Sequence, residues 1–121
     1  MTTALVIDDN RLPADGLCQL LSLLDIDACP AYGSRAGILF MAEEVPDIVF
    51  LDINMPGVGG FEVLGFMRRE PRLLNIPVVV VTADDSMETL DKAFELGAVD
   101  LITKPASLEA LENVLKQVNL V

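Results

Sequence analysis

The sequence contains no histidine and only two cysteines among its 121 residues. The absence of histidine excludes Ser-His-Asp triads, histidine-ligated zinc sites and a phosphohistidine carrier within this chain. Cys18 and Cys29 lack the spacing of a metal site. We therefore expect two small buried hydrophobic side chains at these positions rather than a redox pair.

Basic residues are also scarce, because eight Lys and Arg stand against 19 Asp and Glu, which gives a net charge of −11. Such a charge repels a phosphate backbone, so we expect no direct nucleic-acid binding. It is compatible with cation binding and with docking onto a basic or neutral protein surface. No apolar run approaches the ~20 residues of a membrane-spanning helix, and the first residues lack the basic leader of a secretory signal. We expect no membrane insertion and a cytoplasmic location.

Apolar runs alternate with helical patterns five times, which is typical of βα units in a parallel sheet. With 52% hydrophobic residues the chain can bury one core, so we expect a single domain over residues 1–121. Runs that are apolar throughout predict strands buried on both faces, and Pro30 predicts an edge strand. The expected strands cover residues 4–7, 27–32, 48–51, 78–81 and 98–103.

Capping residues and apolar stripes locate the helices between these strands. Asp9 or Asn10 can cap the first helix, Ser34 the second and Ser107 the last, while Gly97 is expected to end the fourth. Apolar spacing predicts which side chains face the core. The expected core residues are Leu17, Leu20, Leu21 and Leu24 in the first helix, Phe40 and Met41 in the second, Met87, Leu90, Ala93 and Phe94 in the fourth, and Leu108, Leu111, Leu115 and Val118 in the fifth.

Five polar residues stand at or just after the ends of the apolar runs. If the strands are parallel neighbours, their carboxyl ends share one edge of the sheet, where open α/β folds bind ligands. The five residues are Asp8, Asp9, Asp52, Thr82 and Lys104. Crowded carboxylates repel one another and raise at least one pKa unless a cation neutralises them. Mg²⁺ prefers oxygen ligands and is often held by one or two carboxylates together with a phosphate.

The same residues supply the parts of a phosphoryl-transfer site. Asp52 follows a central strand, and its carboxylate can act as a nucleophile toward phosphorus. Lys104 offers a positive charge to a phosphate oxygen, and Thr82 offers a hydroxyl donor. The small Ala83 leaves the mouth of the site open to a donor. The sequence therefore predicts a site for a divalent cation and a phosphoryl group.

Four short segments, in this order and at these separations, resemble a two-component response-regulator receiver domain of the single-domain chemotaxis type. The resemblance covers essentially the whole chain. The segments are Val6-Ile7-Asp8-Asp9-Asn10, Val49-Phe50-Leu51-Asp52-Ile53-Asn54-Met55-Pro56-Gly57, Val80-Val81-Thr82-Ala83 and Ile102-Thr103-Lys104-Pro105.

This resemblance implies a doubly wound α/β fold with helices on both faces of a five-stranded parallel sheet, in the flavodoxin-like order 2-1-3-4-5. It implies that Asp52 is phosphorylated from the phosphohistidine of a partner kinase or phosphotransfer protein. It also implies Mg²⁺ (or Mn²⁺) bound by Asp9, Asp52 and the main-chain carbonyl of Asn54, with Asp8 assisting through water. The Lys104–Pro105 bond is expected to be cis.

The resemblance further implies a switch that a downstream target protein reads. Thr82 moves toward the phosphate, and the surface of the fourth helix, fifth strand and fifth helix changes. Asn54 and Asp84 occupy positions that influence how readily water attacks the acyl phosphate. One position departs from the family pattern, since the usual Tyr or Phe three residues before the lysine is Leu101. Leucine has neither a ring to swing nor a hydroxyl to offer.

The expected role is therefore a signalling module that catalyses its own phosphorylation and dephosphorylation, and not an enzyme acting on other substrates. Two other functions stay open. Leu101 permits a receiver-like interaction scaffold that works without phosphorylation. A small phosphohydrolase with an aspartyl nucleophile, of the haloacid-dehalogenase type, is disfavoured because neither Asp8 nor Asp52 begins an Asp-x-Asp pattern: Asp8 is followed by Asp9-Asn10 and Asp52 by Ile53-Asn54. Leu12, with Pro13, Pro105 and Ala106, either docks a partner or closes the core.

Overall fold

The structure, a computed structural model, describes all 121 residues as five strands alternating with five helices. The elements are β1 (Thr3–Ile7), α1 (Arg11–Ser22), β2 (Asp27–Ala31), α2 (Ser34–Glu43), β3 (Ile48–Leu51), α3 (Gly60–Arg69), β4 (Val78–Thr82), α4 (Met87–Glu95), β5 (Asp100–Thr103) and α5 (Leu108–Gln117). No helix combines the length and the hydropathy needed to traverse a bilayer.

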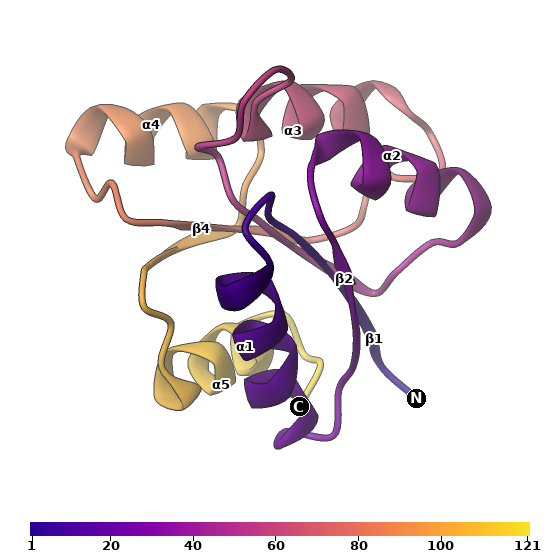
Figure 1. The fold of residues 1–121 in the computed structure, drawn as a ribbon, viewed down its shortest axis with the longest axis vertical. Helices are drawn as coiled ribbons and strands as arrows, with labels where there is room; N and C mark the ends of the chain where they lie inside the picture. The colour runs from indigo at the N-terminus through magenta and orange to yellow at the C-terminus, as the bar shows by residue number, and fades with distance from the viewer.

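The strands form one parallel sheet in the order β2-β1-β3-β4-β5. Helices α2, α3 and α4 cover one face of this sheet, and α1 and α5 cover the other (Figure 1). The predicted fold class and strand order are therefore confirmed. The strand that contains Pro30 lies at an edge, as the missing amide donor requires.

Every residue of β3 and β4 is buried, and so are the last four residues of β1. Alternate residues of each strand enter two separate cores, one beneath α2, α3 and α4 and the other beneath α1 and α5. Phe50, for example, belongs to the second core, whereas its neighbour Leu51 belongs to the first. This two-sided burial explains why the central strands are apolar without alternation.

Strand register decides which residues meet at the carboxyl edge. Ile7 of β1 lies opposite Leu51 of β3, so the aspartates that follow these two residues are neighbours. At the other side of the sheet, Thr82 of β4 pairs with Thr103 of β5, which places Lys104 just beyond the ladder. The sheet thus gathers residues far apart in the sequence along one edge.

Helix α4 covers the sheet less completely than its sequence pattern predicts. The expectation that Met87 and Phe94 are buried is wrong, because these side chains are 68% and 45% exposed. Ala93 alone among the residues of α4 is buried. The physical reason is position: α4 lies beside β5, the outermost strand, and no further strand extends the core beneath its outer side.

Three other details differ from the expected elements. Ser34 is the first residue of α2 rather than its cap, and the cap is Gly33 in a positive-φ conformation that suits glycine. The Ser34 hydroxyl instead donates a hydrogen bond to the Val58 carbonyl. Strand β5 begins at Asp100, two residues later than predicted. Leu108, the first residue of α5, is 38% exposed, because it lies on the first turn, ahead of the turns that bury Leu111 and Leu115.

The expectation of two buried cysteines is also wrong. Cys29 is exposed and Cys18 is half-buried, and both are free thiols. Cys29 lies on the edge strand β2, where one side of the strand has no neighbour. Leu12 does not close the core either, since it is 84% exposed on the first turn of α1.

A close approach at the start of α3 yields a stability prediction. A Cβ added to Gly60 would meet the Asp52 carbonyl oxygen and lie 2.5 Å from the Ile53 Cα, and backbone atoms cannot move aside as a flexible side chain can. We expect Gly60→Ala to lower the free energy of unfolding by about 2 kcal/mol in urea titrations. In Gly16→Ala the new methyl group meets nothing within 4 Å, so this control should gain about 0.5–1 kcal/mol from helix propensity. Equal stability of Gly60→Ala and the unaltered protein would contradict the packing described.

Candidate functional site

Asp8 and Asp52 form the centre of the site and are buried, with only 4% and 5% of their surface exposed. Their backbones continue the sheet's hydrogen bonds beyond the strand ends. The Asp52 amide donates to the Ile7 carbonyl at 2.9 Å, and the Asp8 amide donates to the Ala31 carbonyl at 3.1 Å. Both carboxylates are therefore held in place by the sheet and not by a flexible loop.

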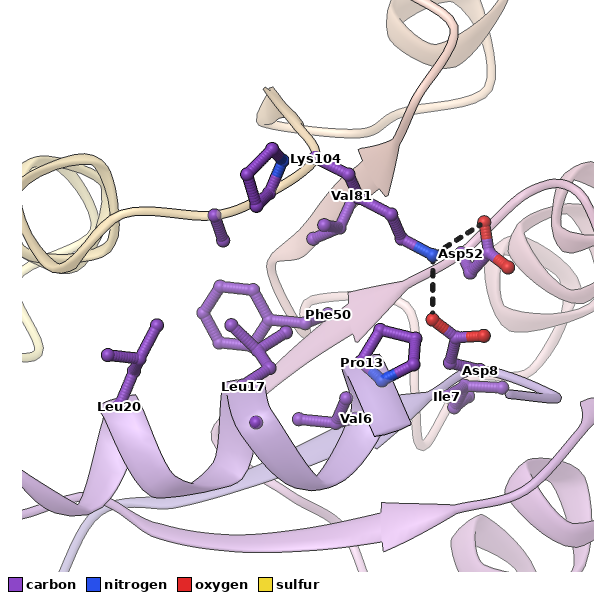
Figure 2. Close-up of a pocket in the computed structure, with 13 residues that line it drawn as sticks. Val6, Ile7, Asp8, Pro13, Leu17, Leu20, Phe50, Asp52, Val81 and Lys104 are labelled. Carbon is purple, nitrogen blue, oxygen red and sulfur yellow. Dashed lines mark hydrogen bonds and ion pairs between the residues drawn. The ribbon is translucent and has the colours of Figure 1, made fainter. Parts of the chain in front are cut away.

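Lys104 joins β5 to these two carboxylates. Its amide donates to the Thr82 carbonyl at 2.7 Å, which fixes the backbone beside β4. Its ammonium Nζ lies 2.8 Å from Asp8 Oδ2 and 3.7 Å from Asp52 Oδ1 (Figure 2). The following Lys104–Pro105 peptide bond is cis, as the resemblance to receiver domains implies. One ammonium thus bridges the ends of β1 and β3.

Asp9 completes a cluster of three carboxylates. Asp8, Asp9 and Asp52 each offer an oxygen, and these oxygens lie within 4.8 Å of one another. Asp9 is exposed, so ligands on its side can include water. A hard divalent cation such as Mg²⁺ takes oxygen donors and retains several waters. The residues present therefore fit the requirements of a magnesium ion.

The Asp52 carboxyl responds to this crowded environment. Its pKa is raised from the ordinary 3.8 to about 6, mainly by burial and also by the charge of Asp8. A hydrogen bond from the Asn54 amide and the charge of Lys104 oppose this shift. The hydrogen bond joins Asn54 N to Asp52 Oδ1 at 3.2 Å. A nearby cation would relieve the excess negative charge, because it favours the ionised carboxyl.

Thr82 is connected to the site by a hydrogen bond from Asn54, and its own side chain is not exposed to solvent. The Asn54 side-chain amide donates to Thr82 Oγ1 at 3.2 Å, and the Asp84 amide donates to the same oxygen at 3.1 Å. The Thr82 side chain is completely buried, whereas Ala83 beside it is exposed. Leu101 lies on the neighbouring strand β5, three residues before Lys104. It pairs with Val80 and is partly buried against the core beneath α2, α3 and α4.

Sequence reasoning missed the side-chain contacts of the loops. It assigned the backbone carbonyl of Asn54 to a metal but gave its side chain no contact with Thr82. Asp84 accepts from the Thr89 hydroxyl at 2.7 Å and the Ser86 amide at 3.0 Å, so it reinforces the start of α4 and its pKa is lowered by these bonds. The Asp-x-Ser spacing of an Asx turn is the signal that locates this contact. Of the two residues offered as cap of α1, Asn10 makes the bond, since its Oδ1 accepts from the Leu12 amide at 3.3 Å.

Comparison with known proteins accounts for this arrangement. The sequence model of the family described as "Response regulator receiver domain" matches residues 4–116. The chain belongs to this family. It is a receiver domain of the kind found in two-component response regulators, which act as signalling modules.

Curated relatives of this receiver domain include longer response regulators. An uncharacterized response regulatory protein of Vibrio vulnificus (strain CMCP6) is 41% identical over 122 residues, which cover 98% of this chain and 48% of that protein. The DNA-binding dual master transcriptional regulator RpaA of Synechocystis sp. is 32% identical over 111 residues, or 92% of this chain and 46% of the regulator. The chain thus spans about half the length of these relatives.

Solved structures support the fold of the receiver domain. The chemotaxis protein CheY4 of Vibrio cholerae superposes with a TM-score of 0.91 at 24% sequence identity, and the match covers 98% of each chain. A response regulator of Clostridium difficile gives a TM-score of 0.90 at the same identity, over 98% of this chain and 96% of that one. At this level of identity the comparison establishes the shared fold.

The raised pKa of Asp52 predicts a pH-dependent stability. Between pH ~4 and ~6 the folded receiver binds more protons at Asp52 than the unfolded chain does, so stability falls as the pH rises through this range. In EDTA at pH 7.5, we expect Asp52→Asn to raise the free energy of unfolding by about 1–2 kcal/mol, an amount reduced for solvent screening at the open mouth. The gain should largely disappear at pH 4. Asp91→Asn on the exposed side of α4 is the control, and a gain for Asp52→Asn that does not vary with pH would contradict this assignment.

Proposed function

We propose that this receiver domain accepts a phosphoryl group on Asp52 from the phosphohistidine of a partner histidine kinase or phosphotransfer protein. The observation that carries the proposal is the grouping of one buried carboxylate with two further carboxylates and a lysine at the carboxyl edge of the sheet. Membership of the receiver family supports the same reaction. The role is that of a signalling module and not of an enzyme with a released product.

The transfer uses groups that the chain already holds in position. An ionised Asp52 oxygen attacks the phosphorus, the P–N bond to the partner's imidazole breaks, and that imidazole nitrogen takes up a proton. With a pKa of about 6, Asp52 is mainly ionised at neutral pH and can act as the nucleophile. Lys104, now 3.7 Å from Asp52 Oδ1, is placed to pair with a phosphoryl oxygen.

Mg²⁺ fits beside the nucleophile, and Mn²⁺ can replace it. The proposed ligands are Asp9, Asp52 and the main-chain carbonyl of Asn54, with Asp8 assisting through water. When bound, the ion neutralises negative charge that builds on the phosphoryl oxygens. Asp8 then retains its ion pair with Lys104 at 2.8 Å, which holds the lysine at the mouth of the site.

The proposed output is a rearrangement of the surface formed by α4, β5 and α5, read by a downstream target protein. A phosphoryl group adds about −1.5 to −2 charges and new acceptor oxygens. Thr82 is buried and bonded to Asn54 and Asp84, so reaching the phosphate requires those bonds to change. Because Asp84 also accepts hydrogen bonds from the Thr89 hydroxyl and from the amide of Ser86, the N-cap of α4, a movement of Thr82 acts on the start of that helix. Helix α4 is suited to two positions, since it buries only Ala93.

Leu101 affects how a change at the phosphorylation site reaches the surface formed by α4, β5 and α5. It fills space beside β4 without an aromatic ring, so we propose that the backbone and α4 transmit the change rather than a rotating side chain. The net charge of −11 supports a protein target over direct contact of this domain with nucleic acid.

Phosphoryl uptake is tested with acetyl phosphate as a small donor. In Mg²⁺ we expect intact-protein mass spectrometry to detect a gain of one phosphoryl group, and we expect EDTA to abolish it. Asp52→Asn should show no gain, because its amide is not a nucleophile toward phosphorus. Asp85→Asn, an exposed change after β4, is the matched control and should be modified like the unaltered protein.

Two results would count against the proposal. An unchanged mass gain in Asp52→Asn would place the phosphoryl group on another residue. Release of many equivalents of phosphate per protein from phosphate esters would favour the phosphohydrolase function instead.

A further inference from the structure

Arg68, on the last turn of α3, donates hydrogen bonds to three backbone carbonyls that belong to two separate loops. Its Nη1 bonds to the Leu74 carbonyl. Its Nη2 bonds to the Ile76 carbonyl at 3.2 Å and to the Gly97 carbonyl at 3.3 Å. Leu74 and Ile76 precede β4, whereas Gly97 follows α4. We call this set of three bonds the Arg68 clamp, because it ties the end of α4 to α3 and to the chain that enters β4.

The guanidinium of Arg68 is committed to these carbonyls and to no acidic partner. No carboxylate forms an ion pair with it, although the chain carries 19 acidic residues. Burial lowers the pKa of Arg68. Gly97 has a φ of 95°, and a Cβ built on it would lie 2.8 Å from Arg68 Nε. The guanidinium therefore packs directly against the turn that ends α4, and a side chain at Gly97 would disturb the contact.

The C-terminal end of α4 has further anchors besides the Arg68 clamp. Ala93 and Ala98 are only 1% and 6% exposed, and the Ala98 amide donates to the Ala93 carbonyl at 2.9 Å. The Lys92 ammonium lies 4.7 Å from the centre of the Phe61 ring, which belongs to the first turn of α3. Figure 1 shows α3 and α4 on the same face of the sheet. This end of α4 is thus fixed to its surroundings by packing and by polar contacts.

The start of α4 has no comparable anchors. Every residue from 83 to 88 is exposed, and no hydrogen bond or ion pair joins residues 85–91 to another helix or to a strand. The polar link to the sheet runs through Asp84. Its amide donates to Thr82 Oγ1 at 3.1 Å, and its carboxylate accepts from the Thr89 hydroxyl at 2.7 Å. The two ends of one helix are therefore held very unequally.

We propose that α4 turns about the Arg68 clamp, so that its first turn moves while its C-terminal end stays in place. The helix keeps its own backbone hydrogen bonds during this motion and rotates as a rigid rod. With a rise of about 1.5 Å per residue, a rotation of about 10° about Gly97 displaces Ser86 by roughly 3 Å, which is one hydrogen-bond length. Loss of the single bond from Asp84 to Thr82 is therefore sufficient to release the start of the helix.

This motion belongs to the unmodified domain, whereas its use as an output rests on the proposed phosphorylation of Asp52. Since Thr82 and the start of α4 are joined through Asp84, a change at the phosphorylation site reaches the movable end of the helix first. The Arg68 clamp then converts a small displacement of Thr82 into a rotation rather than a shift of the whole helix. Arg68 is in this sense a positioning residue.

The pivot is tested first on the unmodified protein, by relaxation dispersion of its backbone amides, which detects exchange between conformations on the microsecond-to-millisecond timescale. We expect exchange at residues 83–90 and none at residues 95–98. In Arg68→Met, which keeps an apolar stem but loses every donor, the exchange should extend to residues 95–98. Arg69→Met is the matched control, because it removes the same charge from the next and exposed position of α3, and it should behave like the unaltered protein.

A second measurement links the pivot to the phosphorylation site. Beryllofluoride with Mg²⁺ serves as a stable analogue of the phosphoryl group, and amide chemical shifts are compared with and without it. We expect large changes at residue 52 and at residues 83–90, and small ones at residues 74–76 and 95–98. An unchanged residue 52 would count against phosphorylation of Asp52, while the dispersion measurement would still decide on the pivot.

Three outcomes overturn the proposal. In the unaltered protein, exchange of equal size along all of α4, or its absence from residues 83–90, would contradict a pivot at Gly97. A folded Arg68→Met protein without exchange at residues 95–98 would remove the clamp as its cause. Shift changes as large at residues 95–98 as at residues 83–90, with residue 52 also shifted, would show that the whole helix moves. If Arg68→Met does not fold, the exchange profile of the unaltered protein decides the question.

Discussion

Two buried carboxylates lie side by side in this domain because the parallel register of β1 and β3 leaves them no other position. Ile7 faces Leu51, so Asp8 and Asp52 emerge together at the carboxyl edge of the sheet. Lys104 lies beside them because it directly follows β5, which pairs with β4 in the same parallel sheet. The remaining features of the site follow from the burial of these carboxylates and from their closeness: the raised pKa of Asp52, which burial causes more than the charge of Asp8, and the affinity expected for a cation.

The two buried carboxylates lower the stability of the fold, although the proposed function depends on them. A carboxylate buried next to another one destabilises the folded chain, and the sheet tolerates it because its own core is large and apolar on both faces. A bound cation, and then a phosphoryl group with Lys104, each change the balance of charge at that point. The loop from Thr82 to the cap of α4 lies next to the change and has few buried contacts, so it is the part of the molecule most able to respond.

The sequence contains enough information to predict the fold and the members of the site, because both depend on uninterrupted apolar runs followed by polar residues. Such runs are local and easily recognised, as for residues 48–51 before Asp52. Features that depend on three-dimensional packing are not encoded in this local way. The exposure of Phe94 depends on the edge position of α4, and the bond from Asn54 to Thr82 joins two loops.

Paramagnetic broadening by Mn²⁺ tests the central claim most directly, since it locates a cation without requiring catalysis. If the carboxyl ends of β1 and β3 form one oxygen-lined site, substoichiometric Mn²⁺ should first broaden the amide signals of residues 8–10 and 52–54. Excess Mg²⁺ should restore these signals, and Asp52→Asn should weaken the effect. Broadening that spreads evenly over the acidic surface, or that begins at Glu109 and Glu112 on α5, would contradict the account.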